Sequence, residues 1–196
     1  MLTQLATVKQ RLALQNIDTQ YDDLLTRVIG AVSGRFDLEC NRTLARTIGA
    51  THEFPIRDTE NPVPCYPIET VVRFETKATE ALGWVEQPDI DYIIRGRCVV
   101  SLYSLLPIPA PEAQLARLIY TGGYVLPGNT PEPGQAALPA DLENAAIEQI
   151  AFWFQRRDNV GVIRIWPSGG NYMQLVDTDL LPAVRAVLRK HARFNL

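Results

Sequence analysis

Apolar residues recur at helical spacing at both ends of this 196-residue chain, while in its middle they alternate with polar residues or form β-branched runs. Near the N-terminus, Leu5, Val8 and Leu12 predict a helix over Thr3–Leu14, capped by Thr3. A second helix over Thr19–Cys40 carries a longer apolar stripe. The stripe comprises Tyr21, Leu24, Leu25, Val28, Ile29, Val32 and Phe36.

Two glycines interrupt this second helix four residues apart. Gly30 and Gly34 each cost roughly 1 kcal/mol of helix propensity relative to alanine. We therefore expect a neighbouring backbone to approach the helix closely at these positions, which would compensate for that cost.

From about Arg46 onward the chain has the period and the turn residues of short strands. The expected strands are Thr47–Phe54, Ile68–Thr76, Trp84–Glu86, Tyr92–Arg95, Cys98–Tyr103 and Arg117–Tyr120. A tight hairpin is predicted across Gly96. Strands of this length and spacing are typical of a small antiparallel sandwich or barrel.

Helical spacing returns after Leu138. Leu138-Pro139-Ala140-Asp141 predicts the start of a helix that runs to Arg157, with Asp141 capping its free N–H groups. A last helix is expected from Leu180 to about Arg193. Between them, 158–179 is long for a loop and too apolar for a solvated linker, which indicates a partner surface. Its apolar residues include Val162, Ile163, Ile165, Trp166, Tyr172 and Met173.

These patterns predict an α+β fold in which the N- and C-terminal helices pack into one helical bundle domain and a small antiparallel β module is inserted between them. The helical domain would be discontinuous, covering 1–45 and 138–196. The β-sandwich or barrel-like module would cover 46–127, and a Pro/Gly-rich linker would cover 128–137.

Charge and composition narrow the function. A net charge of −3 and a pI near 5.4 argue against nucleic acid as the main ligand. No apolar run has the length of a membrane span, and the N-terminus has no secretory pattern, so we expect a cytosolic protein without membrane contact. The final helix is locally basic, with Arg185, Arg189, Lys190 and Arg193. These residues complement the helix dipole or serve a docking or DNA-facing role, and both readings stay open.

Candidate chemistry is sparse. The two histidines, His52 and His191, belong to no Ser-His-Asp set, and no Gly-x-Ser-x-Gly elbow or phosphate loop is present. Gly122-Gly123 is expected to form a turn. The three cysteines are too far apart for a zinc pair or a disulfide framework. We expect no catalytic residue, no cofactor and no metal, and therefore no enzyme.

Several motifs occur in a particular order along the chain. After the paired N-terminal helices come Tyr66-Pro67-Ile68 at the entry to a strand, Asp91-Tyr92 before a hairpin, and Ile119-Tyr120-Thr121-Gly122-Gly123-Tyr124. Leu138-Pro139-Ala140-Asp141-Leu142 completes the set. In this order the chain resembles the head–tail connector (adaptor) proteins of tailed bacteriophages. The segment 158–179 is a departure, because it is longer than this resemblance implies.

The resemblance implies a structural virion protein of the neck, which is assembled in the host bacterial cytoplasm. It would form a homo-oligomeric ring beneath the portal, most simply a dodecamer, that extends the DNA channel and presents the tail attachment surface. DNA would pass only as cargo. Portal docking would map to Arg189, Lys190, Arg193, Phe194 and Leu196. The apolar residues of 158–179 would contact neighbouring subunits or a tail-side neck or tail-completion protein.

Two alternatives remain. The chain would be a tail-completion or neck protein that binds the tail rather than the portal, or a DNA-binding regulator that uses the basic C-terminal helix. The first predicts binding to tail tube, and the second predicts salt-sensitive binding to duplex DNA.

Overall fold

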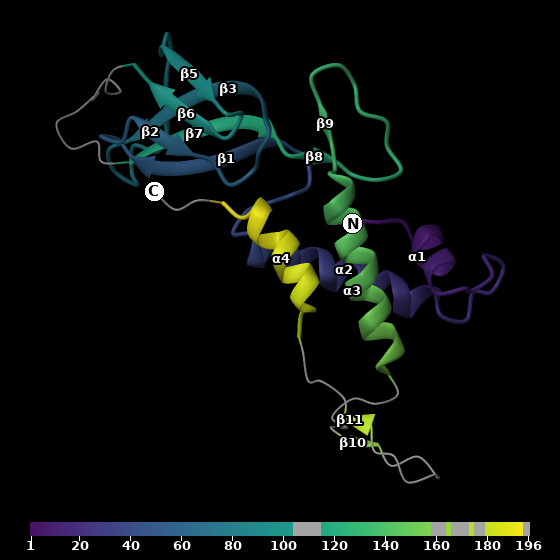
Figure 1. Cartoon of the computed structure of the whole chain (residues 1–196). Helices are drawn as coiled ribbons and strands as arrows, with labels where there is room; N and C mark the ends of the chain where they lie inside the picture. Colours follow the sequence, from purple (N-terminus) through teal and green to yellow (C-terminus); the bar gives the residue numbers. More distant parts are fainter. Residues whose placement is uncertain (104–114, 158–163, 166–172, 175–178, 194–196) are drawn as a thin grey trace. The chain divides into compact units, whose positions relative to one another are not determined.

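A computed structural model of the chain describes residues 1–103, 115–157, 164–165, 173–174 and 179–193. The chain divides into two compact units, one formed by 1–36 and 139–191 and the other by 37–138 and 192–196. The first unit is helical, and the second is built of short strands (Figure 1). The α+β class predicted from the sequence is confirmed, whereas the bundle arrangement stays a prediction.

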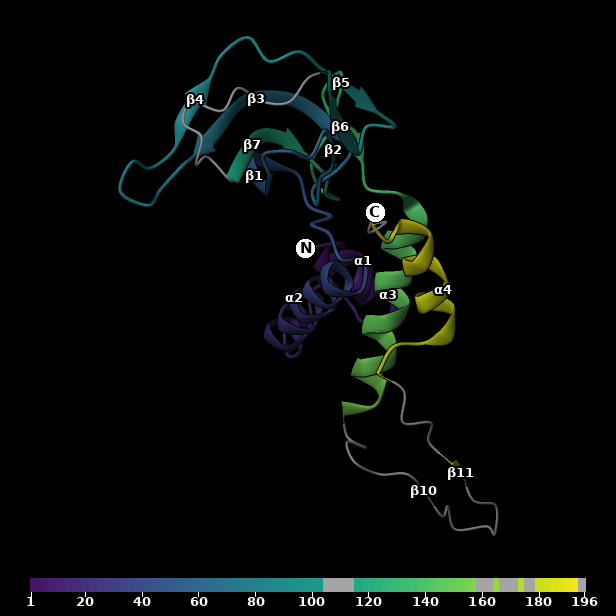
Figure 2. The same cartoon turned by 90° about the vertical axis from the view of Figure 1, so that its left-hand side faces the viewer.

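Among the described residues, four helices and one short hairpin make up the helical unit. They are α1 (Leu5–Arg11), α2 (Asp22–Glu39, whose last turn belongs to the strand unit), α3 (Ala140–Gln155), α4 (Pro182–His191), β10 (Arg164–Ile165) and β11 (Met173–Gln174). In both views of the molecule α3 lies between α1 and α4, and it packs against each of them (Figures 1 and 2).

The apolar stripe of α2 is narrower than its sequence predicts. Leu25, Ile29, Val32 and Phe36 are fully buried, and each lies one helical turn after the one before. Leu24, which the sequence pattern placed in the same stripe, is 40% exposed. Leu24 therefore lies at the edge of the apolar stripe and not at its centre.

The two glycines of α2 do not have the neighbour that we expected. A Cβ built on Gly30 or Gly34 meets nothing within 4 Å, and both residues are exposed. The expected close approach of a backbone is wrong for the described part of this chain. Their cost in helix propensity therefore has no compensation there.

The other helix ends differ from the sequence predictions by a few residues. The first helix begins after Gln4, so Thr3 is not its cap. Thr3 is buried, and its hydroxyl donates to Glu143 at 3.3 Å. Helix α3 begins at Ala140 after Pro139, and Asp141 lies within its first turn, where its carboxylate accepts the N–H of Leu142 at 2.9 Å.

The strand unit contains a four-stranded antiparallel sheet and a three-stranded one (Figures 1 and 2). The first has the order β1-β7-β3-β4 and the second β2-β6-β5, while β8 and β9 form a short parallel pair. The strands are β1 (Thr47–Pro55), β2 (Glu60–Pro62), β3 (Ile68–Lys77), β4 (Val85–Gln87), β5 (Tyr92–Arg95), β6 (Val99–Leu102), β7 (Leu115–Gly122), β8 (Tyr124–Val125) and β9 (Ala136–Ala137).

The hairpin predicted across Gly96 is confirmed. Strands β5 and β6 pair antiparallel, from Tyr92 with Leu102 to Arg95 with Val99. Gly96 and Arg97 both have positive φ in the turn between them, as tight hairpin turns require. Strand β2 is not among the strands expected from the sequence, and β9 lies in the segment that we expected to be a linker.

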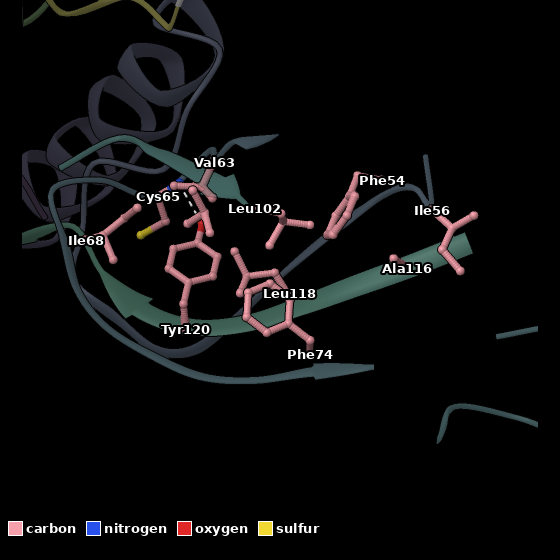
Figure 3. Packing of buried hydrophobic residues seen from close by; sticks show 11 residues of the cluster. Phe54, Ile56, Val63, Cys65, Ile68, Phe74, Leu102, Ala116, Leu118 and Tyr120 are labelled. Carbon is pink, nitrogen blue, oxygen red and sulfur yellow. Dashed lines mark hydrogen bonds between the residues drawn. The ribbon is translucent and has the colours of Figure 1, made fainter. Parts of the chain in front are cut away.

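The core of the strand unit is formed by residues from both larger sheets and from the segment before β3 (Figure 3). Eleven buried residues form it: Phe54, Ile56, Val63, Cys65, Ile68, Phe74, Val100, Leu102, Ala116, Leu118 and Tyr120. Tyr120 is its largest fully buried side chain, and its hydroxyl accepts the backbone N–H of Cys65 at 3.0 Å. Burial raises the pKa of Tyr120.

Candidate interaction surfaces

The Gly-Gly-Tyr motif has a structural role in the strand unit. A Cβ on Gly122 would lie 2.5 Å from the carbonyl oxygen of Cys65, and a Cβ on Gly123 would lie 2.6 Å from that of Ala45. Gly123 also has φ of +99°, a conformation that glycine adopts without strain. Backbone segments distant in sequence therefore meet at this motif, and only glycine fits between them.

A buried arginine completes this junction. Arg42 is 4% exposed, and its guanidinium lies over the ring of Tyr66, 3.2 Å from the centroid, and 5.2 Å from the ring centroid of Tyr124. It also donates to the backbone oxygen of Tyr66. Because its hydrogen bond and both ring contacts lie within one unit, we assign Arg42 to folding.

Burial shifts the pKa values of two cysteines and of His52. Burial raises the pKa of the Cys40 thiol to about 11 and also raises that of Cys65, so neither is a thiolate at neutral pH. Burial, with a smaller contribution from the charge of Arg193, lowers the pKa of His52 to about 4. His191 contacts Asp141 through Nε2 at 3.0 Å, and this hydrogen bond holds the pKa of the carboxyl below its usual range.

Across the described ranges, no group of three His, Cys, Asp or Glu side chains is arranged to hold a metal ion. None of the described helices is long and apolar enough to cross a membrane.

One open groove of about 550 Å³ lies beside β8 and the start of β1. Its wall carries two charged residues, Arg46 and Glu132, and Arg46 makes a two-pronged ion pair with Glu69, at 2.8 and 2.9 Å. The guanidinium is therefore committed to a protein carboxylate, and the groove provides no constellation for chemistry.

The residues predicted to dock on the portal fall into three groups. Arg189 and Lys190 are exposed on α4. Arg193 is half-buried, its backbone N–H donates to Cys40 at 2.8 Å, and its guanidinium donates to the backbone oxygen of Pro62 at 2.6 Å. Phe194 and Leu196 lie outside the described residues.

The apolar residues predicted to contact neighbouring subunits or the tail are described only in part. Ile165 and Met173 pair with each other in the β10–β11 hairpin, so part of the predicted irregular segment is β structure. The remaining four residues lie outside the described ranges: Val162, Ile163, Trp166 and Tyr172.

A polar anchor that the sequence patterns did not reveal holds the chain where it enters α4. Gln149 is fully buried on α3, donates to the backbone oxygen of Asp179 at 3.0 Å and accepts the N–H of Leu181 at 2.9 Å. The indole of Trp153 donates to the same oxygen at 3.0 Å, and Arg35 pairs with the Asp179 carboxylate at 2.6 Å. A glutamine within an apolar helix face is the one signal of this anchor in the sequence.

No protein-family model matches this sequence, and no curated protein matches it. Solved structures do match. A chain in the neck of an empty gene transfer agent particle, determined with C6 symmetry, has a TM-score of 0.62 at 14% identity, over 100% of this chain and 91% of that one. A chain in the virion of a native gene transfer agent particle has a TM-score of 0.59, with the same identity and coverage. The α+β fold described above is therefore similar, over the whole chain, to that of proteins in gene transfer agent particles.

Proposed function

We propose that this chain is a structural neck protein of a phage-like particle, a head-to-tail adaptor without enzymatic activity. The observation that carries the proposal is the fold likeness to a chain in the neck of a gene transfer agent particle, which extends over all of this chain. Because fold alone does not fix function, the ordered motifs of the sequence matter as independent support.

The motifs agree with a scaffold role. Gly122, Gly123 and Arg42 hold the strand unit together, and Asp141 and Gln149 hold α4 against α3. The cysteines with raised pKa values and the lowered pKa of His52 are poorly suited to catalysis at neutral pH. We therefore assign no catalytic residue, cofactor or metal.

In the proposed assembly, copies of the chain form a ring under the portal and extend its DNA channel towards the tail. A dodecamer would match a twelvefold portal and would also obey the C6 symmetry with which the similar neck was determined. The ring would belong to the neck of the virion and would be assembled in the host cytoplasm, with DNA as passing cargo.

Two surfaces would provide the external contacts. We propose that the end of α4 and the residues after it dock on the portal, through Arg189, Lys190, Arg193, Phe194 and Leu196. The apolar residues of 158–179 would contact neighbouring subunits or a tail-side protein. Portal docking and contact with a neighbour or the tail need different patches on each subunit, and these two segments are chemically distinct.

The test is a set of binding measurements on the full chain by native mass spectrometry, with purified portal rings, tail tube and duplex DNA in separate arms. The proposal predicts one bound copy per portal subunit and little binding to DNA. Binding to tail tube without portal binding would instead identify a tail-completion protein. Salt-sensitive binding to duplex DNA alone would identify a regulator, and either result would overturn the adaptor proposal.

A further inference from the structure

The solvent face of α4 is cationic and has few intramolecular partners. Arg185, Arg189 and Lys190 are exposed, as are Ala183 and Ala186, and α4 carries no acidic residue. Within the described part of the chain, neither Arg185 nor Arg189 makes an ion pair.

Other arginines of the same unit behave differently. Arg11 makes a two-pronged ion pair with Glu148, at 2.9 and 3.1 Å, and Arg35 pairs with Asp179 at 2.6 Å. The unpaired arginines of α4 therefore form a surface that a carboxylate-bearing partner would complement.

The complementary charge lies at the start of α2. Asp18 and Asp23 are exposed, and no cationic side chain among the described residues contacts either carboxylate, whereas the neighbouring Asp22 pairs with Lys9 at 2.5 Å. Two exposed apolar residues accompany these carboxylates, Ile17 at 86% and Leu24 at 40% exposure. We call Ile17, Asp18, Asp23 and Leu24 the acidic corner.

The basic face and the acidic corner lie on different sides of the helical unit. Helix α3 packs against α4 on one side and against α1, which leads into the acidic corner, on the other (Figures 1 and 2). Two complementary patches on opposite sides of one subunit are what a head-to-tail contact requires, and such contacts close into rings when the rotation between copies permits it.

We propose that the basic face of α4 in one copy binds the acidic corner of the next copy, with Arg185 and Arg189 opposite Asp18 and Asp23. This inference rests on the proposed ring and names the contact that builds it. A protein partner is favoured over DNA because α4 offers no Ser, Thr, Asn or Gln to a phosphate backbone and the chain has a net charge of −3.

Lys190 lies on another side of α4 than the two arginines of this contact. At about 100° per residue, Arg185 and Arg189 lie about 40° apart around α4, whereas Lys190 lies about 140° from Arg185. Arg189 would then face the neighbouring copy instead of the portal, which removes it from the proposed docking residues, and Lys190 would remain available to the portal. Lys190→Glu is therefore a matched control, because it reverses one exposed charge of the same helix on another side.

The experiment uses two charge-reversed full-length chains, Arg185→Glu/Arg189→Glu and Asp18→Lys/Asp23→Lys. Their oligomer mass is measured by native mass spectrometry and sedimentation over a range of concentrations, alone and with portal rings. Each variant alone should require at least about tenfold more protein to assemble than the unaltered chain, because like charges then meet across the contact. In the absence of portal rings, Lys190→Glu should assemble as the unaltered chain does.

The decisive measurement is the oligomer mass of an equimolar mixture of the two variants. In an alternating ring, the acidic α4 of one variant meets the basic corner of the other, which is the original contact with both charges reversed. The remaining contact, between an unaltered basic α4 and an unaltered acidic corner, is the original one. Equimolar mixing should therefore restore assembly, which also shows that both variants are folded. Failure to restore it, or normal assembly of either variant alone, would overturn the inference.

The other outcomes separate this inference from the proposed function. An unaltered chain that forms rings through these charges but ignores the portal would contradict the adaptor role and leave the contact supported. Portal binding that neither charge reversal weakens would contradict the contact and leave the adaptor role supported. An unaltered chain that assembles in neither condition, or binding of duplex DNA that Arg185→Glu/Arg189→Glu abolishes, would overturn the contact.

Discussion

Gly122 lies directly against the backbone of Cys65: a Cβ on the glycine would come within 2.5 Å of the Cys65 carbonyl oxygen. The last residue of β7 and the segment before β3 are therefore in main-chain contact. Since the obstructing atom belongs to the backbone, no side-chain rotation relieves the clash, and a larger residue at position 122 must displace one of the two segments.

Gly122→Ala should accordingly destabilise the strand unit by about 1–3 kcal/mol, as overpacking in a tight core does. Gly30→Ala is the matched control, because a Cβ on Gly30 meets nothing within 4 Å and the residue lies in a helix. It should stabilise the protein by about 0.5–1 kcal/mol. Urea unfolding of both variants measures the difference, and equal effects of the two substitutions would refute the role assigned to Gly122.

Tyr120→Phe should cost about 1–3 kcal/mol, because it removes the hydroxyl that accepts the buried Cys65 N–H and takes this hydrogen bond from the group. The m-value should not change, since the aromatic ring still fills the core. Tyr103→Phe is the control on a residue that is 73% exposed, and it should have no effect. A loss of stability that is the same for both variants would contradict the hydrogen bond's contribution.

Gln149→Leu should loosen the entry to α4. The substitution keeps the apolar contacts of α3 but removes both hydrogen bonds to the backbone at Asp179 and Leu181. Amide hydrogen exchange in α4 should then be faster, while β7 should exchange as before. Gln155→Leu, on the exposed end of α3, should leave both unchanged. Unaltered exchange in α4 of Gln149→Leu would show that this anchor does not hold the helix.

The stability of the strand unit should fall as pH decreases from about 6.5 to about 4. In the folded chain burial lowers the pKa of His52 to about 4, against 6.5 for an unperturbed histidine. Between these values the unfolded chain binds more protons than the folded one, so acid favours unfolding and the stability present above pH 6.5 is lost on acidification. Thermal unfolding of His52→Gln should show a weaker pH dependence in this window. A slope identical to that of the unaltered chain would place the titrating group elsewhere.

Local patterns predicted the elements whose apolar residues follow a helical or strand period, or whose turn residues lie between two short strands. The apolar stripe of α2, the alternation in β1 and β3, and the hairpin across Gly96 can all be read over a few residues. Strand β2 could not be predicted in this way, because Asn61 and Pro62 have the composition of a turn. It pairs with β6 through distant residues, and the Glu60 carboxylate accepts the Ser101 hydroxyl at 3.0 Å and binds Arg95.

The two charged surfaces also differ in how far local sequence patterns reveal them. The basic run of α4 is visible in the sequence, since three exposed cations fall within six residues. The complementary acidic patch at Asp18 and Asp23 cannot be recognised in the sequence, because acidic residues at the start of a helix commonly interact with the helix dipole. Only the packing of α3 between α1 and α4 shows that the two charged patches lie on different sides of one unit.

Electron microscopy of portal rings incubated with the full chain tests whether this protein is an adaptor. We expect a second ring, coaxial with the portal and bound to one of its faces, with one copy of the chain for each portal subunit and an open channel through both. Portal rings that stay bare at saturating protein concentration, or copies scattered over the portal without symmetry, would contradict the proposed function.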